Sequence, residues 1–178
     1  MIDTSDSGLD RPMSAVHSCS TRVLCLGNDL LGDDSLGSRV ASRVQQFAPT
    51  DVEVFSTSES GFSLLDYLLG THRLIVIDTV VTGNALPGTI YKICESELKL
   101  HAGGSPHYIG LFETIALSRY LRLPVAEEVL ILAVEATQCF TVGDEMNPAV
   151  SAAIPALVEI VRNRIGARTT HRTRGFVA

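Results

Sequence analysis

The sequence predicts an α/β protein, a three-layer α/β/α sandwich whose mostly parallel, twisted sheet has about five strands. Short apolar segments alternate along the chain with segments of helical periodicity, which is the order expected of a sheet covered by helices on both faces. The segment RLIVID, Arg73–Asp78, is apolar at consecutive positions, as in a central parallel strand that is buried on both sides. The chain has 178 residues, 46% of them hydrophobic, so it is long enough to bury a proper core.

Each element follows from a local pattern. Apolar residues recur at helical spacing from Asp33 to about Phe47, and Pro49 ends this helix. Ser105-Pro106 and Asn147-Pro148 each place a capping residue before a proline, which is typical of a helix start, and Pro155 is expected to kink or interrupt the last helix. In chain order the expected elements are a strand over Thr21–Gly27, the first helix, a strand over Val52–Phe55, a helix over Gly61–Leu69, strands over Arg73–Asp78 and Thr89–Ile93, a helix over Pro106–Leu121, a strand over Glu128–Glu135 and a helix from Pro148 to about Ile165.

The composition indicates one α/β domain, over residues 21–165. Residues 1–20 are small and polar and are expected to form a disordered N-terminal extension, and residues 166–178 a flexible C-terminal tail. No segment has the apolar core of a secretory signal or approaches the roughly 18 apolar residues of a membrane helix. The four cysteines form no C-x-x-C pair, which indicates reduced thiols. We therefore expect a cytoplasmic protein, and a monomer.

The net charge of −6 and the missing motifs exclude several classes of function. Binding to nucleic acid needs many Lys and Arg side chains to neutralise phosphates, and an anionic membrane surface needs them as well, so neither partner is expected. The chain contains no G-x-G-x-x-G, no P-loop lysine after the glycine turn, no G-x-S-x-G and no H-E-x-x-H. A nucleotide-dependent enzyme is therefore disfavoured.

The most informative segment is GNDLLGDDSLG, which follows the first strand and leads into the first helix. In an open α/β sheet, such a turn lies at the edge where ligands bind. Most turns of this kind hold phosphate with backbone N–H groups. Here Asp33 and Asp34 would repel a phosphate, so the turn is better suited to a cation, a proton or a partner that carries a metal.

Three polar residues are expected at this edge: Asp34, Asp78 at the end of the RLIVID strand, and His107 in the first turn of a later helix. Two carboxylates and an imidazole can form a metal site or an acid/base set. Taken singly, each could instead be a helix-terminus charge, a turn residue or a surface histidine. Asp33 is expected to support Asp34 or to act as a helix-terminus charge, and Glu135 is a lesser candidate for a substrate contact.

With these residues in place, the chain resembles the NiFe-hydrogenase maturation endopeptidases over roughly residues 21–165. That family removes a C-terminal extension from the hydrogenase large subunit after nickel has been inserted. The family pattern G-N-x-L-x-x-D-[DE] is matched by Gly27, Asn28, Leu30, Asp33 and Asp34. The chain departs from the family at the segment D-G-G-[ST]-x-G, which reads STSESG here and retains only Gly61 clearly.

The resemblance implies a peptidase whose partner is a NiFe-hydrogenase large-subunit precursor. It places Asp34, Asp78 and His107 at a catalytic site that contacts nickel. Because two carboxylates and one histidine would bind a free metal only modestly, we expect no intrinsic cofactor and assign the nickel to the substrate. Asp34 or Asp78 would act as the base, and His107 would either ligate the metal or protonate the leaving amine.

Two other interpretations stay open at the level of the sequence. One is a non-catalytic nickel-binding checkpoint or carrier protein on the same fold. The other is a hydrolase of a different substrate, such as peptidyl-tRNA, against which the acidic net charge counts.

Overall fold

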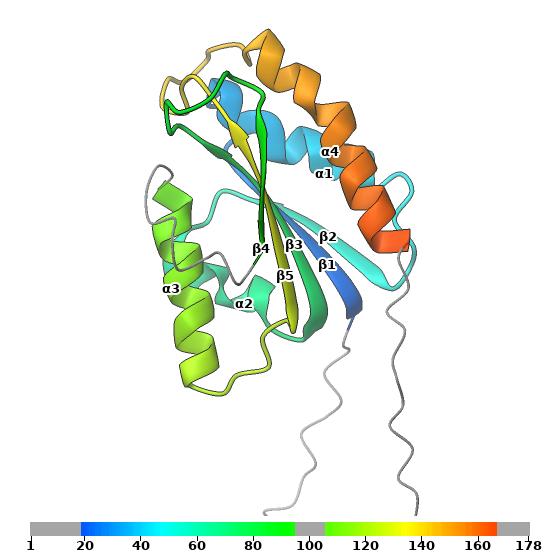
Figure 1. Cartoon of the computed structure of the whole chain (residues 1–178). Helices are drawn as coiled ribbons and strands as arrows, with labels where there is room; N and C mark the ends of the chain where they lie inside the picture. The colour runs from blue at the N-terminus through cyan, green and yellow to red at the C-terminus, as the bar shows by residue number, and fades with distance from the viewer. Residues whose placement is uncertain (1–18, 95–105, 167–178) are drawn as a thin grey trace, which may run out of the picture.

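The computed structural model describes residues 19–94 and 106–166, with the backbone alone described for residue 19 and residues 106–109. The expected N-terminal extension and C-terminal tail therefore lie almost entirely outside the described residues. Figure 1 shows the elements, which in chain order are β1 (Cys19–Leu26), the 3₁₀ turn η1 (Gly32–Ser35), α1 (Leu36–Val44), β2 (Val52–Thr57), η2 (Gly61–Leu64), α2 (Leu65–Leu68), β3 (Thr71–Val80), β4 (Ile90–Cys94), α3 (Pro106–Tyr120), β5 (Glu128–Glu135) and α4 (Pro148–Gly166).

The described strands form one five-stranded sheet in the order β2-β1-β3-β5-β4. The first four of these run parallel, and β4 at the edge pairs antiparallel with β5. The direction of β4 follows from the short connection 81–89, because a parallel crossover needs a dozen or more residues to return the chain across the sheet. The predicted mostly parallel sheet is therefore confirmed, with one reversed strand that the sequence pattern does not reveal.

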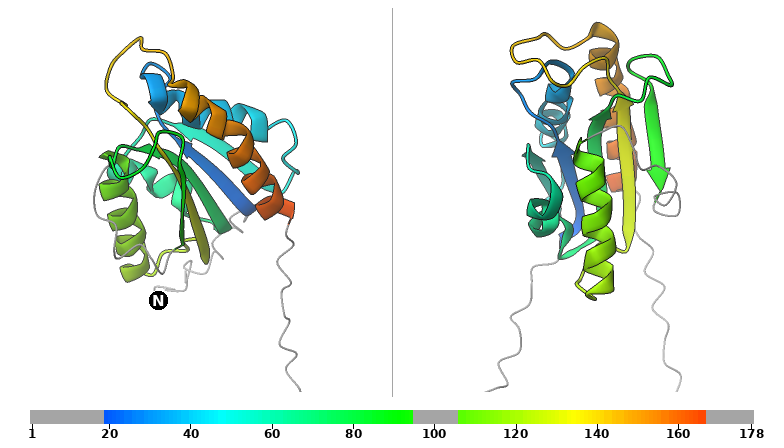
Figure 2. Two further views of the ribbon diagram at one scale, coloured as in Figure 1. Left: turned by 45° about the horizontal axis from the view of Figure 1, so that its top comes forward. Right: turned by 90° about the vertical axis from the view of Figure 1, so that its left-hand side faces the viewer.

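Helices cover both faces of the sheet and make the three layers that the sequence predicts. Figures 1 and 2 show α1 and α4 together on one face, and α2 and α3 on the other. Side chains of β3 alternate between these faces: Ile75 and Ile77 join the core under α1 and α4, whereas Leu74 and Val76 join the core under α2 and α3. RLIVID is thus buried on both sides, as its composition predicts.

The structure differs from the sequence prediction in several details, and the expected helix over Gly61–Leu69 is divided into η2 and α2. The first helix is divided into η1 and α1, because the Ser35 hydroxyl closes a tight turn on the carbonyl of Gly32. Strand β3 continues to Val80, so Asp78 lies inside the strand and not at its end. Helix α4 runs through Pro155 without interruption. Pro155 is exposed, so water can reach the carbonyl that loses its donor.

The carboxyl ends of β1, β2, β3 and β5 meet at the top of the molecule in Figure 1, together with the connections 81–89 and 136–147. The start of β1 and the end of α4 lie at the opposite end. Among the described helices, none is both long and apolar enough to cross a membrane.

Candidate active site

The first turn folds back over the end of β1 because Gly27 takes a conformation that suits only glycine. Its φ is +142°, and a Cβ at this position would overlap the carbonyl oxygen of Asp34. The backbone N–H of Asn28 then donates to Asp34 Oδ2 at 2.8 Å. The Asn28 side chain accepts from the N–H of Leu30 at 3.0 Å, which closes the turn locally. Gly27 therefore lets the backbone of Asp34 approach closely, and the backbone N–H of Asn28 holds the Asp34 carboxylate.

Asp34 is only 4% exposed, and its second oxygen is held from the neighbouring strand. The hydroxyl of Thr79, on β3, donates to Asp34 Oδ1 at 2.9 Å. The carboxylate thus accepts one hydrogen bond on each oxygen and retains further lone pairs for a water molecule or a cation. The turn after β1 and the end of β3 are joined at this point.

Asp78 is fully buried and lies next to Thr79 on β3. Its Oδ1 accepts the backbone N–H of Thr79 at 2.7 Å. In the sheet register, Asp78 lies beside Ala133 and Thr79 beside Val134, and these two β5 residues belong to opposite cores. Thr79 therefore points toward the α1/α4 face and Asp78 toward the α2/α3 face. The two acids predicted from the sequence lie at one edge, one on each side of β3.

His107 lies in the first turn of α3, and its side chain is outside the described residues. The helix is fixed at the carboxyl edge by a backbone contact, since a Cβ on Gly110 would overlap the backbone of Gly61. The hydroxyl of Thr114, which donates to the carbonyl of Gly110 within α3, also lies 3.1 Å from the carbonyl oxygen of Gly61. Gly61 follows the carboxyl end of β2 and has φ +59°, a left-handed conformation that favours glycine.

Cys139 is a site neighbour that sequence analysis missed. Its thiol donates to Thr79 Oγ1 at 3.4 Å, and the side chain is 8% exposed. Burial raises the pKa of Cys139 to about 11; the hydrogen bond with Thr79 opposes this rise, and the charges of Asp34, Asp33 and Asp78 add to it. A lone cysteine in a connecting segment carries no sequence signal, so only the fold reveals that it lies among the three aspartates.

Asp33 binds the segment between β5 and α4. Its buried carboxylate accepts the backbone N–H of Asn147 at 2.6 Å, and the N–H and hydroxyl of Thr137 at 2.9 and 2.8 Å. The N–H of Gln138 is a longer fourth donor at 3.4 Å. Asn147 in turn caps α4, because its Oδ1 accepts the N–H of Ala149 at 2.8 Å. Asp33 thus connects the first turn to the segment that contains Cys139.

The carboxylate oxygens of Glu135 accept hydrogen bonds from the connection between β3 and β4 and from β4 itself. It is 1% exposed and accepts from the hydroxyls of Thr82 and Tyr91 at 2.6 and 2.8 Å, and from the N–H groups of Thr82 and Gly83, each at 2.8 Å. Burial alone would raise the pKa of Glu135, but these hydrogen bonds to the ionised form outweigh it and the pKa is lowered. The residue holds the connection in place, and its oxygens are not presented to a substrate.

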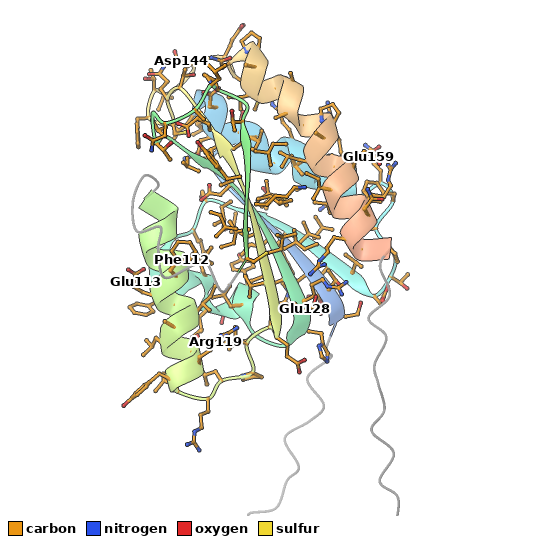
Figure 3. All side chains as sticks on the ribbon, viewed as in Figure 1. Phe112, Glu113, Arg119, Glu128, Asp144 and Glu159 are labelled. Carbon is orange, nitrogen blue, oxygen red and sulfur yellow. The ribbon has the colours of Figure 1, made fainter. Side chains whose placement is uncertain are left out.

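A carboxylate such as that of Asp34 or of Asp78 can accept a proton or add an oxygen ligand to a metal that a partner brings. Within residues 19–94 and 106–166, no three histidine, cysteine, aspartate or glutamate side chains with described positions form a metal-binding group. Asp144 lies in the segment between β5 and α4 at the same end of the molecule, as Figure 3 shows, and a Cβ on Gly32 would come within 3.3 Å of its Cβ. The first turn is therefore packed under this segment.

Comparisons with known proteins agree with this architecture. A model of the hydrogenase maturation protease family (HycI) matches residues 38–164, a range that contains Asp78 and His107 and begins just after the first turn. The hydrogenase 2 maturation protease of Escherichia coli (strain K12) is 29% identical over 102 residues, which are 55% of this chain and 62% of that protein. The match thus spans less than two thirds of the length of this relative.

Solved structures extend the likeness over most of the fold. The hydrogenase-maturating endopeptidase HybD from E. coli superposes with a TM-score of 0.73 at 25% identity, covering 82% of this chain and 91% of HybD. The [NiFe] hydrogenase maturation protease HybD from Thermococcus kodakarensis has a TM-score of 0.67 at 24% identity, over 82% of this chain and 99% of that one, and shows the same fold. Because the family model covers more than half of the chain, the chain belongs to the hydrogenase maturation protease family, a family of peptidases.

Proposed function

We propose that the protein is an endopeptidase that removes the C-terminal extension of a NiFe-hydrogenase large-subunit precursor after nickel insertion. Membership of the hydrogenase maturation protease family supports the reaction class. The observation that carries the rest is the pair of buried acids at one sheet edge, Asp34 and Asp78, both in contact with Thr79. A further part of the proposal is that these acids and His107 contact the nickel that the substrate carries.

Peptide hydrolysis needs a water molecule that loses a proton and a leaving amine that gains one. Asp34 keeps acceptor capacity on both oxygens and is suited to take the proton from water, with Asp78 as the alternative base. Nickel held by the substrate would act as a Lewis acid next to the scissile carbonyl. His107 would ligate this nickel or protonate the leaving amine.

Dependence on nickel follows from the incomplete ligand set. Two carboxylates and a histidine leave coordination positions that ligands from the precursor must fill. A precursor without nickel would therefore be bound less well, and the contact with the metal would distinguish nickel-loaded from nickel-free precursor. The enzyme would need no cofactor of its own.

The test is incubation of the purified protein with nickel-loaded and nickel-free large-subunit precursor, followed by intact mass measurement. We expect one C-terminal peptide to be lost from the loaded form alone. Asp34→Asn and Asp78→Asn should each lose cleavage while retaining the circular dichroism of the wild type. Asp29→Asn is the matched control, because Asp29 is an exposed acid in the same turn.

Two outcomes would contradict the proposal. Equal cleavage of both precursor forms would exclude nickel recognition and leave a peptidase of a different selectivity. Binding of the loaded precursor with no cleavage, at enzyme concentrations equal to the substrate, would favour a checkpoint or carrier protein instead.

A further inference from the structure

We propose that Thr79 is the positioning residue of this site: its hydroxyl, which accepts from the Cys139 thiol, orients the Asp34 carboxylate, while its backbone N–H contacts Asp78. The inference deepens the proposed function and rests on it for the part that concerns turnover. The placement of the carboxylates can be tested without any substrate.

The direction of the hydroxyl follows from counting donors. Thr79 Oγ1 has one proton and lies 2.9 Å from Asp34 Oδ1 and 3.4 Å from Cys139 Sγ. An ionised carboxylate only accepts, whereas a thiol can donate its proton. Cys139 is nearly buried and its raised pKa keeps the thiol protonated at neutral pH. Cys139 therefore donates to Thr79, and Thr79 donates to Asp34.

The position of Thr79 in the strand lets one residue contact both acids. Its side chain points to the α1/α4 face, where the first turn brings Asp34, while its backbone N–H donates to Asp78 at 2.7 Å. Thr79 is 2% exposed, so water does not compete for these contacts. A carboxylate held in one orientation before the substrate binds needs no reorganisation during the reaction.

A second buried threonine on β3, Thr71, lies far from the site and provides a comparison. Thr71 begins β3 at the opposite end, is 6% exposed, and donates from its hydroxyl to the carbonyl of Arg73 at 3.0 Å. Both are buried threonines on β3, and valine has nearly the same shape as threonine and suits a strand. The two hydroxyls differ in their acceptor, which is a backbone carbonyl for Thr71 and a site carboxylate for Thr79.

The experiment compares Thr79→Val, Thr79→Ser and Thr71→Val in the full chain, using the nickel-loaded precursor for kinetics and crystal structures for geometry. We expect Thr79→Val to lower kcat by about 10- to 100-fold with KM within about twofold of the wild type, because the hydrogen bond to the acid is lost but the binding surface is kept. Thr79→Ser, which restores the hydroxyl, should recover kcat to within about threefold, and Thr71→Val should retain it. Cys139→Ala should cause a smaller loss, about two- to fivefold, because a thiol is a weak donor.

In the crystal structure of Thr79→Val, the Asp34 carboxylate should rotate away from its wild-type position, and in Thr79→Ser it should stay. An unmoved carboxylate in Thr79→Val, or wild-type kcat for this variant, would overturn the inference. If the wild type fails to cleave the precursor while the carboxylate still rotates in Thr79→Val, the proposed function fails and the positioning role stands.

Discussion

Replacing Asp33 with alanine is expected to destabilise the protein by about 3–5 kcal/mol. The carboxylate is 2% exposed and accepts three short hydrogen bonds, from the N–H of Asn147 and from the N–H and hydroxyl of Thr137. Hydrogen bonds to a charged group contribute roughly 1.5–3 kcal/mol each, so the simple sum of three is about 4.5–9 kcal/mol and lies mostly above the expected loss. The expected loss is set lower than the sum because water can enter the vacated space and accept hydrogen bonds from some of these donors.

The assay is urea unfolding followed by circular dichroism, with the free energy of unfolding taken by linear extrapolation. The control is Asp29→Ala, which removes the same charge from an exposed position in the same turn and should change stability by no more than about 0.5 kcal/mol. Asp33→Asn should fall between the two, because an amide can accept on one side only. A loss below about 1 kcal/mol for Asp33→Ala would refute the reasoning, since the carboxylate would then not hold the connection before α4.

Three further predictions concern the surrounding structure. Gly27→Ala should lower the thermal midpoint sharply or prevent folding, since a Cβ would overlap the carbonyl of Asp34; a midpoint within about 3 °C of the wild type would contradict this. Because hydrogen bonds hold the native pKa of Glu135 below the ordinary value of a glutamate, its ionisation stabilises the fold above that ordinary value, and this stabilisation is lost as the pH falls through the native pKa. Glu135→Gln should therefore lose less stability than the wild type between about pH 6 and pH 3 in urea titrations, and equal losses would count against this prediction. Cys139, with its pKa of about 11, should react with a disulfide reagent at neutral pH only after unfolding, whereas exposed Cys94 should react in the native protein; mass mapping of the labelled residues would expose the opposite order.

The sequence determined the fold class because its signals are local. An apolar run such as the one within RLIVID is typical of a parallel strand covered on both faces. The start of α3 at Pro106 and of α4 at Pro148 follows from a residue pair that favours a helix N-terminus. The signal of the first turn is also local, because the conformation of that segment requires a glycine at Gly27. The parallel order then placed Asp34 and Asp78 at one edge without further information.

The tertiary structure decided the contacts that these acids make. Thr79 meets Asp34 across 45 positions of sequence, Cys139 meets Thr79 across 60, and Asn147 meets Asp33 across 114. Such pairs depend on which strands are neighbours and on their register. The residues of a single segment determine neither the neighbours nor the register. The sequence therefore identified the acids of the candidate site, whereas the hydroxyl, the thiol and the supporting carboxylate that hold them became visible only when strands distant in the chain were brought side by side.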